Sequence, residues 1–186
     1  LTHANAQFVT LASALNLRLR AVILERFTKS RLLDIARAHG CTVFTLLGGM
    51  TTALYAEPSR PDDADTPLRM VISAGMPASL WQAFEARFGL KVYEFYGAAE
   101  GGLCLNPPGV GPVGSVGRAP PGLQLGILDD DDRECPPGGV GEICFRAVAG
   151  PELAVNYHAN PEASRQKVRG GWLRMGDMGH VDENGW

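Results

Sequence analysis

The pattern that most constrains the fold is a strand, a helix and a second strand that follow one another with short connections. Residues 68–73 have the composition of a strand, and residues 78–88 place their large apolar side chains on one helical stripe. Gly89 ends this helix, and residues 91–95 form the next strand. Units joined this tightly form right-handed crossovers between parallel strands. The sequence therefore predicts an α/β fold with a parallel sheet.

Two turns that contain glycine follow the strands of this unit. Gly75 comes after the first strand, and Tyr96 and Gly97 come after the second. Open α/β sheets usually bind ligands at the carboxyl ends of their parallel strands. A tyrosine ring can stack on a purine, glycine lets the backbone approach a ligand, and the carboxylate of Glu100 can hold a divalent metal beside phosphate. These residue types together predict a nucleotide site.

The rest of the chain divides into a helical part and a β-rich part. Residues 30–39 predict a helix that stops at Gly40, and residues 41–47 predict a further strand. From about residue 101 onward, glycine and proline become frequent and short strand patterns replace helical periodicity. We therefore predict an α/β subdomain over residues 1–105 and a smaller β-rich subdomain over residues 106–186.

Composition and charge exclude several classes of function. The 186 residues carry a net charge of −3 with no cluster of Lys and Arg, so we expect no nucleic-acid partner. The four cysteines are isolated and fit no zinc motif, which favours reduced thiols in the cytoplasm. The acidic run at residues 129–132 lacks the ligand spacing of an EF-hand and predicts a solvated hairpin turn. No apolar stretch is long enough for a membrane span, and no signal-peptide pattern is present.

Several short motifs occur in an order and at a spacing typical of one family. In chain order they are Ser73-Ala74-Gly75-Met76-Pro77, Tyr96-Gly97-Ala98-Ala99-Glu100, Gly114-Ser115-Val116-Gly117-Arg118, Pro136-Pro137-Gly138-Gly139-Val140-Gly141-Glu142 and Trp172-Leu173-Arg174-Met175-Gly176-Asp177. With them, essentially the whole chain resembles the adenylate-forming superfamily, and within it the AMP-forming acyl-CoA ligases. Ordered motifs are far more specific than one alone. The resemblance implies part of the large N-terminal domain of an acyl-CoA synthetase-like fold.

The resemblance also implies a reaction and its cofactors. A carboxylic acid, with fatty acids as one class, attacks the α-phosphate of ATP and gives an acyl adenylate and pyrophosphate. The thiol of coenzyme A, the co-substrate, then displaces AMP to form a thioester. Mg²⁺ neutralises the charge that develops on the phosphates. The expected partners are therefore small molecules, namely the acid, ATP and coenzyme A.

Individual residues take roles from the same resemblance. Tyr96 would stack on adenine, Asp177 would bind the ribose hydroxyls, and Glu100 would hold Mg²⁺. His3, in the segment of residues 1–7, would border the acyl carboxylate, so Glu100 and His3 are the candidate catalytic residues. The residues that would border the nucleotide are Gly75, Met76, Pro77, Glu94, Phe95, Gly97, Ala98 and Ala99.

The sequence departs from the family pattern in ways that bear on activity. Ala99 stands where the family has a threonine that donates to the α-phosphate, and Met175 replaces a second threonine. Loss of one charge-assisted hydrogen bond costs about 1.5–3 kcal/mol, which predicts slower adenylation unless another donor serves. The sequence contains neither the phosphate loop of the family nor the lid that carries its adenylation lysine. We therefore expect this chain, a middle fragment by resemblance, to be inactive in isolation.

Two alternatives stay open at this point. An amino-acid-activating adenylation domain would carry an acidic residue near the start of this region, and residues 2–7 have none. A non-catalytic remnant that binds a nucleotide or an acyl group would explain Ala99. The identity of the acid cannot be predicted, because one methylene changes discrimination by only about 1–3 kcal/mol. The sequence does not predict the oligomeric state either.

Overall fold

The computed structural model describes residues 3–186, and their contacts form two compact units. The first unit holds Leu1–Phe95 and Asn106–Ser115, and the second holds Tyr96–Leu105 and Val116–Trp186. The proposed subdomain boundary after residue 105 stays a prediction. Among residues 3–186, no helix has both the length and the hydropathy needed to cross a membrane.

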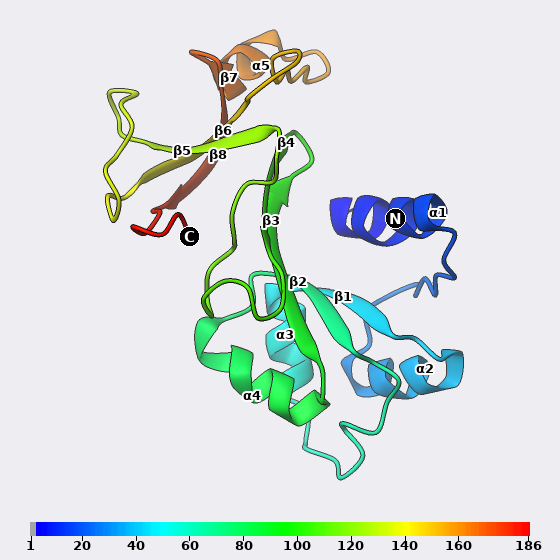
Figure 1. The fold of residues 1–186 in the computed structure, drawn as a ribbon. Coiled ribbons are helices and arrows are strands. Elements are labelled where there is room, and N and C mark those ends of the chain that lie inside the picture. Colours follow the sequence, from blue (N-terminus) through cyan, green and yellow to red (C-terminus); the bar gives the residue numbers. More distant parts are fainter. Residues whose placement is uncertain (1–2) are drawn as a thin grey trace. The chain divides into compact units, whose positions relative to one another are not determined.

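The first unit is built on parallel strands. Strands β1 (Val43–Leu47), β2 (Met70–Ala74) and β3 (Lys91–Ala98) are neighbours in this order, and both pairings are parallel. Helix α4 (Ala78–Phe88) joins β2 to β3 and ends at Gly89, which adopts a left-handed conformation with a φ of 64°. This arrangement confirms the predicted α/β fold with its strand–helix–strand crossover (Figure 1).

Further helices precede and follow β1 in this unit. The predicted helix over residues 30–39 is confirmed, since α2 ends at the left-handed Gly40, with a φ of 62°. These helices are η1 (Asn5–Ala12), α1 (Ser13–Leu17), η2 (Lys29–Arg31), α2 (Leu32–His39) and α3 (Gly48–Tyr55).

Helix α3 was not predicted from the sequence. Its first turn contains two glycines and two threonines follow within the helix, all residues of low helix propensity. Tertiary packing stabilises the helix instead, because Thr51 and Leu54 are buried. A Cβ atom on Gly48 would lie 2.8 Å from the carbonyl oxygen of Gly75, so glycine at residue 48 permits the close approach of two backbones.

The core of the first unit explains why the crossover is stable. Helix α4 buries Trp81, Phe84 and Phe88, and the rings of Phe84 and Phe88 lie 4.6 Å apart between centroids. Val71 of β2 and Val92 of β3 are fully buried in the same cluster. Full burial of one such side chain stabilises a fold by about 1.5–3 kcal/mol. The stripe that predicted the helix is therefore also the face that holds it on the sheet.

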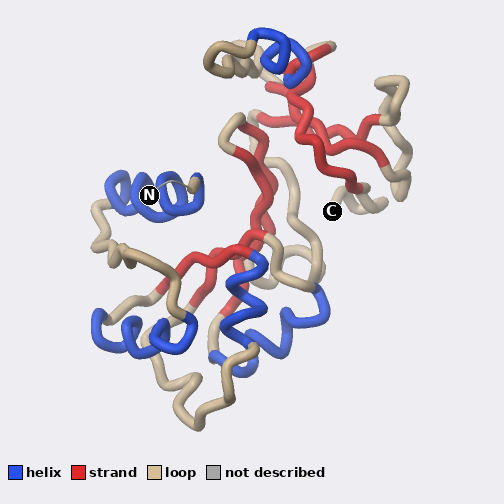
Figure 2. Tube along the Cα trace, turned by 180° about the vertical axis from the view of Figure 1, so that it is seen from behind, coloured by secondary structure: helices blue, strands red, loops and turns tan. Residues whose placement is uncertain are grey.

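The second unit is mainly β, as the sequence predicted (Figure 2). Strand β4 (Gly101–Asn106) follows β3, and the antiparallel sheet has the strand order β5-β6-β8-β7. Gly170 and Gly171, with φ values of 59° and 77°, form the tight turn between β7 and β8. The bounds of these elements are β5 (Leu123–Leu128), β6 (Gly141–Ala147), α5 (Pro161–Lys167), β7 (Val168–Arg169) and β8 (Trp172–Gly179).

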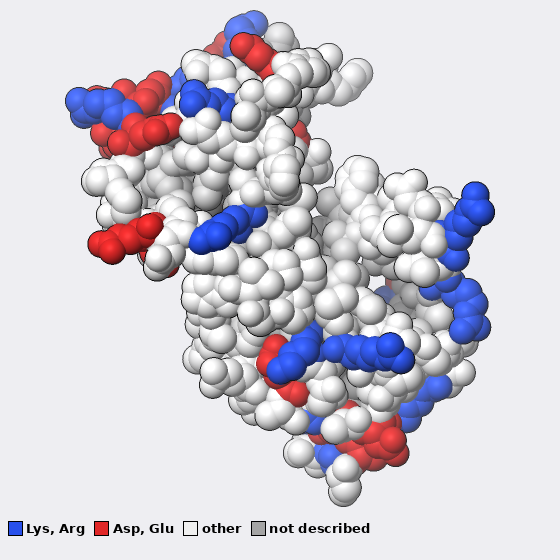
Figure 3. Space-filling model, in the orientation of Figure 1, with Lys and Arg blue, Asp and Glu red and all other residues white. Residues whose placement is uncertain are grey.

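The acidic run of the second unit forms a turn, as expected. The N–H of Asp129 donates to the carbonyl of Arg133 at 2.9 Å, and the Asp129 carboxylate accepts from the N–H of Arg133 at 2.9 Å. Asp132 is not merely solvated, because it pairs with Arg169 at 2.8 Å and also with Arg174. Figure 3 shows acidic and basic side chains next to one another over this part of the unit. Asp132 therefore links the turn to β7 and β8 through ion pairs.

Candidate nucleotide site

The residues predicted to bind a nucleotide form two groups, one in each unit. The first unit contains Gly75, Met76, Pro77, Glu94 and Phe95, together with His3. The second unit contains Tyr96, Gly97, Ala98, Ala99, Glu100 and Asp177.

Glu94 organises the turn between β2 and α4. Its side chain is buried, and one carboxylate oxygen, Oε1, accepts hydrogen bonds from the backbone N–H groups of Gly75 and of Met76, the latter at 3.1 Å. Glu94 lies opposite Ser73 in the register of β2 and β3, which brings its side chain to the end of β2. The carboxylate therefore fixes the backbone of the turn that the resemblance placed beside adenine.

Burial also changes the acidity of Glu94. The other carboxylate oxygen, Oε2, is buried without a hydrogen-bond partner. Desolvation raises the pKa of Glu94 from 4.5 to about 7, although the two N–H donors act in the opposite direction. The carboxyl group is therefore partly protonated at neutral pH.

Replacing Glu94 by glutamine should change how stability depends on pH. In the wild type, the folded state binds more protons than the unfolded state between pH 4.5 and 7, so this group's stabilisation is present at low pH and lost as the pH rises through 7. A pKa difference of about 2.5 corresponds to about 3 kcal/mol. The glutamine of Glu94→Gln does not titrate. The difference in free energy of unfolding, variant minus wild type, should therefore be about 2–3 kcal/mol larger at pH 8 than at pH 5.

Urea unfolding of both proteins at pH 5 and pH 8 measures this difference. Asp65→Asn, at an exposed position of the same unit, is the control for a change of charge alone. Parallel pH profiles of wild type and Glu94→Gln would show that Glu94 ionises in the folded state as readily as in the unfolded one.

The other predicted site residues of the first unit differ in burial and in their backbone contacts. The Met76 side chain is buried in the core, so it is the backbone of Met76 that contributes to the turn. Pro77 precedes the first residue of α4, and its carbonyl accepts from the N–H of Leu80 at 2.9 Å. Phe95 is half-buried in β3. His3 is exposed, and its Nδ1 accepts from the N–H of Asn5 at 3.1 Å, whereas residues 1 and 2 of its predicted segment lie outside the described residues.

Tyr96 and Asp177 lie together although 81 residues separate them in the sequence. The Tyr96 hydroxyl donates to Oδ2 of Asp177 at 2.5 Å. The ring of Tyr96 packs on the core cluster of the second unit, whereas Asp177 is exposed. Burial, followed by the contact with Asp177, raises the pKa of Tyr96 well above its usual range. The hydroxyl is therefore a permanent donor to the carboxylate, and the predicted adenine and ribose residues are neighbours.

The strand that carries Tyr96 is longer than predicted. The sequence predicted that the strand ends at residue 95, but β3 continues through Ala98, and Ala99 and Glu100 form the turn to β4. A Cβ atom on Gly97 would lie 2.7 Å from the carbonyl oxygen of Gly102 in β4. Pairing with β4, which the sequence did not predict, therefore extends the strand and requires glycine at residue 97.

Glu100 lies in this turn and has a partner that the sequence did not predict. The hydroxyl of Tyr157, which precedes α5, donates to Oε1 of Glu100 at 2.7 Å. This hydrogen bond is the main cause that lowers the pKa of Glu100. Tyr157 is followed by Asn160 and Pro161, a helix-start pattern that predicts α5 but not the contact with Glu100.

Glu100 could act as one ligand of a metal ion whose other ligands come from the phosphates of a nucleotide. Among residues 3–186, no group of three or more His, Cys, Asp or Glu side chains forms a metal site. Mg²⁺ in nucleotide sites is commonly held by one or two carboxylates together with phosphate oxygens. One carboxylate in a half-exposed turn therefore fits Mg²⁺ that arrives with ATP.

Glu142, a further residue that the sequence reasoning missed, fixes the backbone beside Asp177. Glu142 of β6 accepts from the N–H of Gly176 at 2.9 Å through Oε1 and from Arg174 at 2.8 Å through Oε2. Arg174 is buried, and Gly176 has a φ of 86°. Because both bonds cross from β6 to β8, they hold the backbone next to Asp177 in place. The glutamate belongs to a motif that the sequence analysis used only for its order.

Comparison with known proteins gives the family of this chain. The family described as AMP-binding enzyme matches residues 1–158. The chain therefore belongs to the AMP-binding enzymes, the adenylate-forming superfamily that its motifs predicted.

Individual relatives agree with this membership. The chain is 34% identical over 188 residues to a medium/long-chain-fatty-acid–CoA ligase of Mycobacterium marinum, covering 100% of this chain and 36% of that protein. It is 30% identical over 189 residues to the crotonobetaine/carnitine–CoA ligase of Salmonella typhi, covering 99% of this chain and 37% of that protein. The chain thus spans about a third of the length of these curated relatives.

Solved structures show the same fold. A benzoate CoA ligase from Burkholderia xenovorans superimposes with a TM-score of 0.83 at 29% identity, covering 95% of this chain and 36% of that one. An anthranilate CoA ligase in complex with anthranoyl-AMP gives a TM-score of 0.84 at 26% identity, covering 97% of this chain and 35% of that one. ATP-bound MatB from Rhodopseudomonas palustris gives 0.83 at 27% identity, covering 98% and 37%. The parallel and antiparallel sheets of this chain are therefore those of the acyl-CoA ligase N-terminal domain.

Proposed function

We propose that the complete protein containing this chain is an AMP-forming acyl-CoA ligase. The observation that carries the proposal is the hydrogen bond between Tyr96 and Asp177, which joins the expected adenine and ribose residues in one unit. Both curated relatives and two of the three solved structures named above are called CoA ligases, which points to the same reaction. The proposal includes a cytoplasmic location, as the composition predicted.

In this proposal the residues bind and orient the substrates. Tyr96 stacks on adenine, and Asp177 accepts from the ribose hydroxyls. Glu94 keeps the turn at Gly75 in shape, so that residues 75–77 border the nucleotide. Glu100 holds Mg²⁺, which when bound neutralises charge on the phosphates, and His3 borders the acid. Coenzyme A is the acceptor of the activated acyl group.

Two alternatives are weaker but have distinct expectations. An amino-acid-activating adenylation domain is less favoured, because both curated relatives and two of the three solved structures named above are CoA ligases. A non-catalytic remnant would follow if the missing hydroxyl at Ala99 abolished adenylation. Such a remnant would still bind AMP, but it would not form an acyl adenylate.

The experiment that tests the proposal is ATP–pyrophosphate exchange by the complete protein. A panel of carboxylic acids, from aromatic to medium- and long-chain fatty acids, and of amino acids is supplied one at a time. We expect exchange with at least one carboxylic acid, and release of AMP when coenzyme A is added. Exchange with amino acids alone would favour the adenylation domain, and AMP binding without any exchange would favour the remnant.

Restoring a hydroxyl at residue 99 should speed adenylation. Ala99 is exposed in the turn before Glu100. A charge-assisted hydrogen bond to the α-phosphate stabilises by about 1.5–3 kcal/mol, so Ala99→Thr should raise the exchange rate about 10- to 100-fold. Ala86→Thr is the matched control, because it adds the same hydroxyl at an exposed position of α4 outside the proposed site. An unchanged rate in Ala99→Thr would show that this hydroxyl does not limit the reaction.

A further inference from the structure

Tyr157 is the one described residue whose side chain is seen to hydrogen-bond Glu100. Its hydroxyl donates to Oε1 of Glu100 at 2.7 Å, across 57 residues of sequence and within the second unit. Both residues are half-buried. Neither the reaction nor the roles proposed above use Tyr157.

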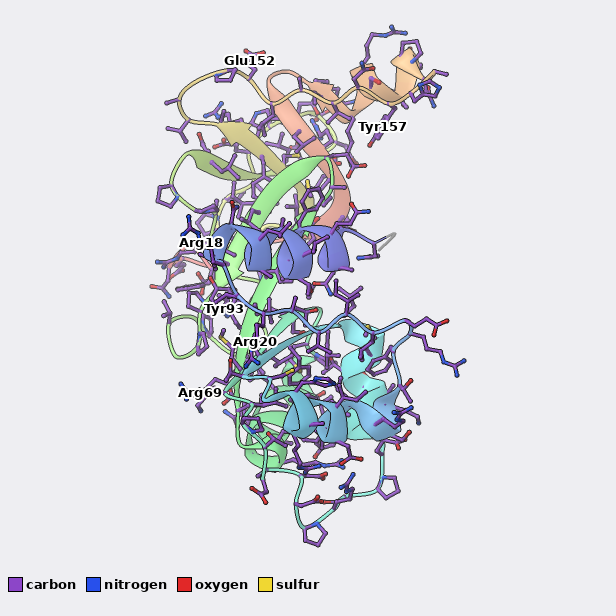
Figure 4. All side chains as sticks on the ribbon, turned by 90° about the vertical axis from the view of Figure 1, so that its right-hand side faces the viewer. Arg18, Arg20, Arg69, Tyr93, Glu152 and Tyr157 are labelled. Carbon is purple, nitrogen blue, oxygen red and sulfur yellow. The ribbon has the colours of Figure 1, made fainter. Side chains whose placement is uncertain are left out.

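The backbone of Tyr157 is itself held in place. Its N–H donates to Oγ of Ser164 in α5 at 2.9 Å, and the Ser164 hydroxyl donates to the carbonyl of Asn160 at 2.9 Å. The Asn160 side chain caps α5 by accepting from the N–H of Ala163 at 3.1 Å. Figure 4 shows Tyr157 in the connection that leads into α5. The hydroxyl is therefore presented by a capped helix start and not by an unsupported loop.

The hydrogen bond constrains how Glu100 can meet a metal. An ionised carboxylate has two oxygens that accept hydrogen bonds or bind cations. The hydrogen bond from Tyr157 to Oε1 would hold the carboxylate in one orientation and leave its remaining acceptor capacity for a cation. Partners of this kind orient metal ligands, and their loss commonly lowers metal affinity by about 10- to 100-fold.

We infer that Tyr157 is a positioning residue for Glu100, which holds the carboxylate so that one oxygen meets the Mg²⁺ of ATP. The inference rests on the proposed function, because it assigns Glu100 to the metal. Tyr157 does not touch the substrate itself. It acts through Glu100 and links the start of α5 to the metal position.

The test measures how strongly Mg²⁺ enhances ATP binding. The complete protein is titrated calorimetrically with ATP, without any acid substrate, in the presence of Mg²⁺ and in the presence of a chelator. In Tyr157→Phe we expect the enhancement by Mg²⁺ to fall about 10-fold, with the metal-free affinity within about twofold of wild type. Phenylalanine keeps the ring, so the unit should fold.

Three further proteins complete the test. Glu100→Gln should lose most of the enhancement, and adding Tyr157→Phe to it should change little more, since the two residues act as one pair. Tyr55→Phe removes a tyrosine hydroxyl from the first unit, where the ring packs against Phe84, and should behave as wild type.

The outcomes separate the inference from the proposed function. An equal enhancement in wild type and Tyr157→Phe would overturn the role of Tyr157 and leave the ligase proposal standing. Equal losses of metal-free and metal-dependent affinity would show a merely structural role and would also overturn it. A wild type that binds ATP equally with and without Mg²⁺ would refute both the metal role of Glu100 and the inference.

Discussion

Replacing Asp177 by alanine should weaken the binding of AMP to the complete protein at least 100-fold. The carboxylate offers two oxygens to the ribose hydroxyls, and each hydrogen bond to a charged group contributes about 1.5–3 kcal/mol. Loss of both bonds removes about 3 kcal/mol or more, and every 1.4 kcal/mol corresponds to a factor of about 10 in affinity. Equilibrium titration with AMP measures the effect directly.

The contact with Tyr96 makes this prediction sharper. The Tyr96 hydroxyl donates to Oδ2 of Asp177, so the carboxylate is already oriented before a nucleotide arrives. Asp177→Asn keeps one acceptor oxygen and should lose only about 10-fold in affinity. Asp130→Ala, at an exposed position of the same unit, removes one negative charge away from the site and should leave binding unchanged. Unaltered affinity in both Asp177→Ala and Tyr96→Ala would remove the basis for the proposed nucleotide site.

Replacing Gly102 by alanine should destabilise the second unit by about 2–5 kcal/mol. Gly102 has a φ of 72°, and a Cβ atom there would lie 2.5 Å from Cδ2 of Phe145 and 2.9 Å from Sδ of Met175. The left-handed backbone costs an L-residue about 1–2 kcal/mol. Overpacking of the core adds about 1–3 kcal/mol, because the Phe145 ring that the new methyl group would meet is fully buried.

A substitution at Gly171 separates the cost of the left-handed backbone from the cost of overpacking. Gly171 has a φ of 77°, and a Cβ atom there would have no neighbour within 4 Å, so Gly171→Ala should cost only about 1–2 kcal/mol. The urea midpoints of both variants, compared at equal m-values, give the difference. Equal losses of stability in the two variants would contradict the packing contribution at residue 102.

Part of the fold could be read from local sequence patterns. Helix α4 begins and ends at the residues that the apolar stripe and Gly89 predicted, and Gly40 ends α2. These signals work because periodicity and left-handed glycine caps act within one or two turns of the chain. Helix α3 lacks such a signal, since Gly48 serves the contact with Gly75 and not the helix. The extension of β3 to Ala98 likewise depends on its pairing with β4.

The sequence alone determined the parallel α/β fold, the mainly β second half, the family and the identity of the candidate site residues. It could do so because these properties depend on local periodicity and on motifs in a fixed order. Only the tertiary structure decided that Tyr96 meets Asp177, that Tyr157 meets Glu100 and that Glu142 supports Gly176. Each of these hydrogen bonds joins residues that are distant in sequence. Strand pairing, of β6 with β8, accounts only for the bond between Glu142 and Gly176, whereas Tyr96 and Asp177 lie in strands of different sheets and Tyr157 lies before α5. A hydrogen bond needs atoms within about 3 Å, and no local pattern specifies which distant partner will come that close.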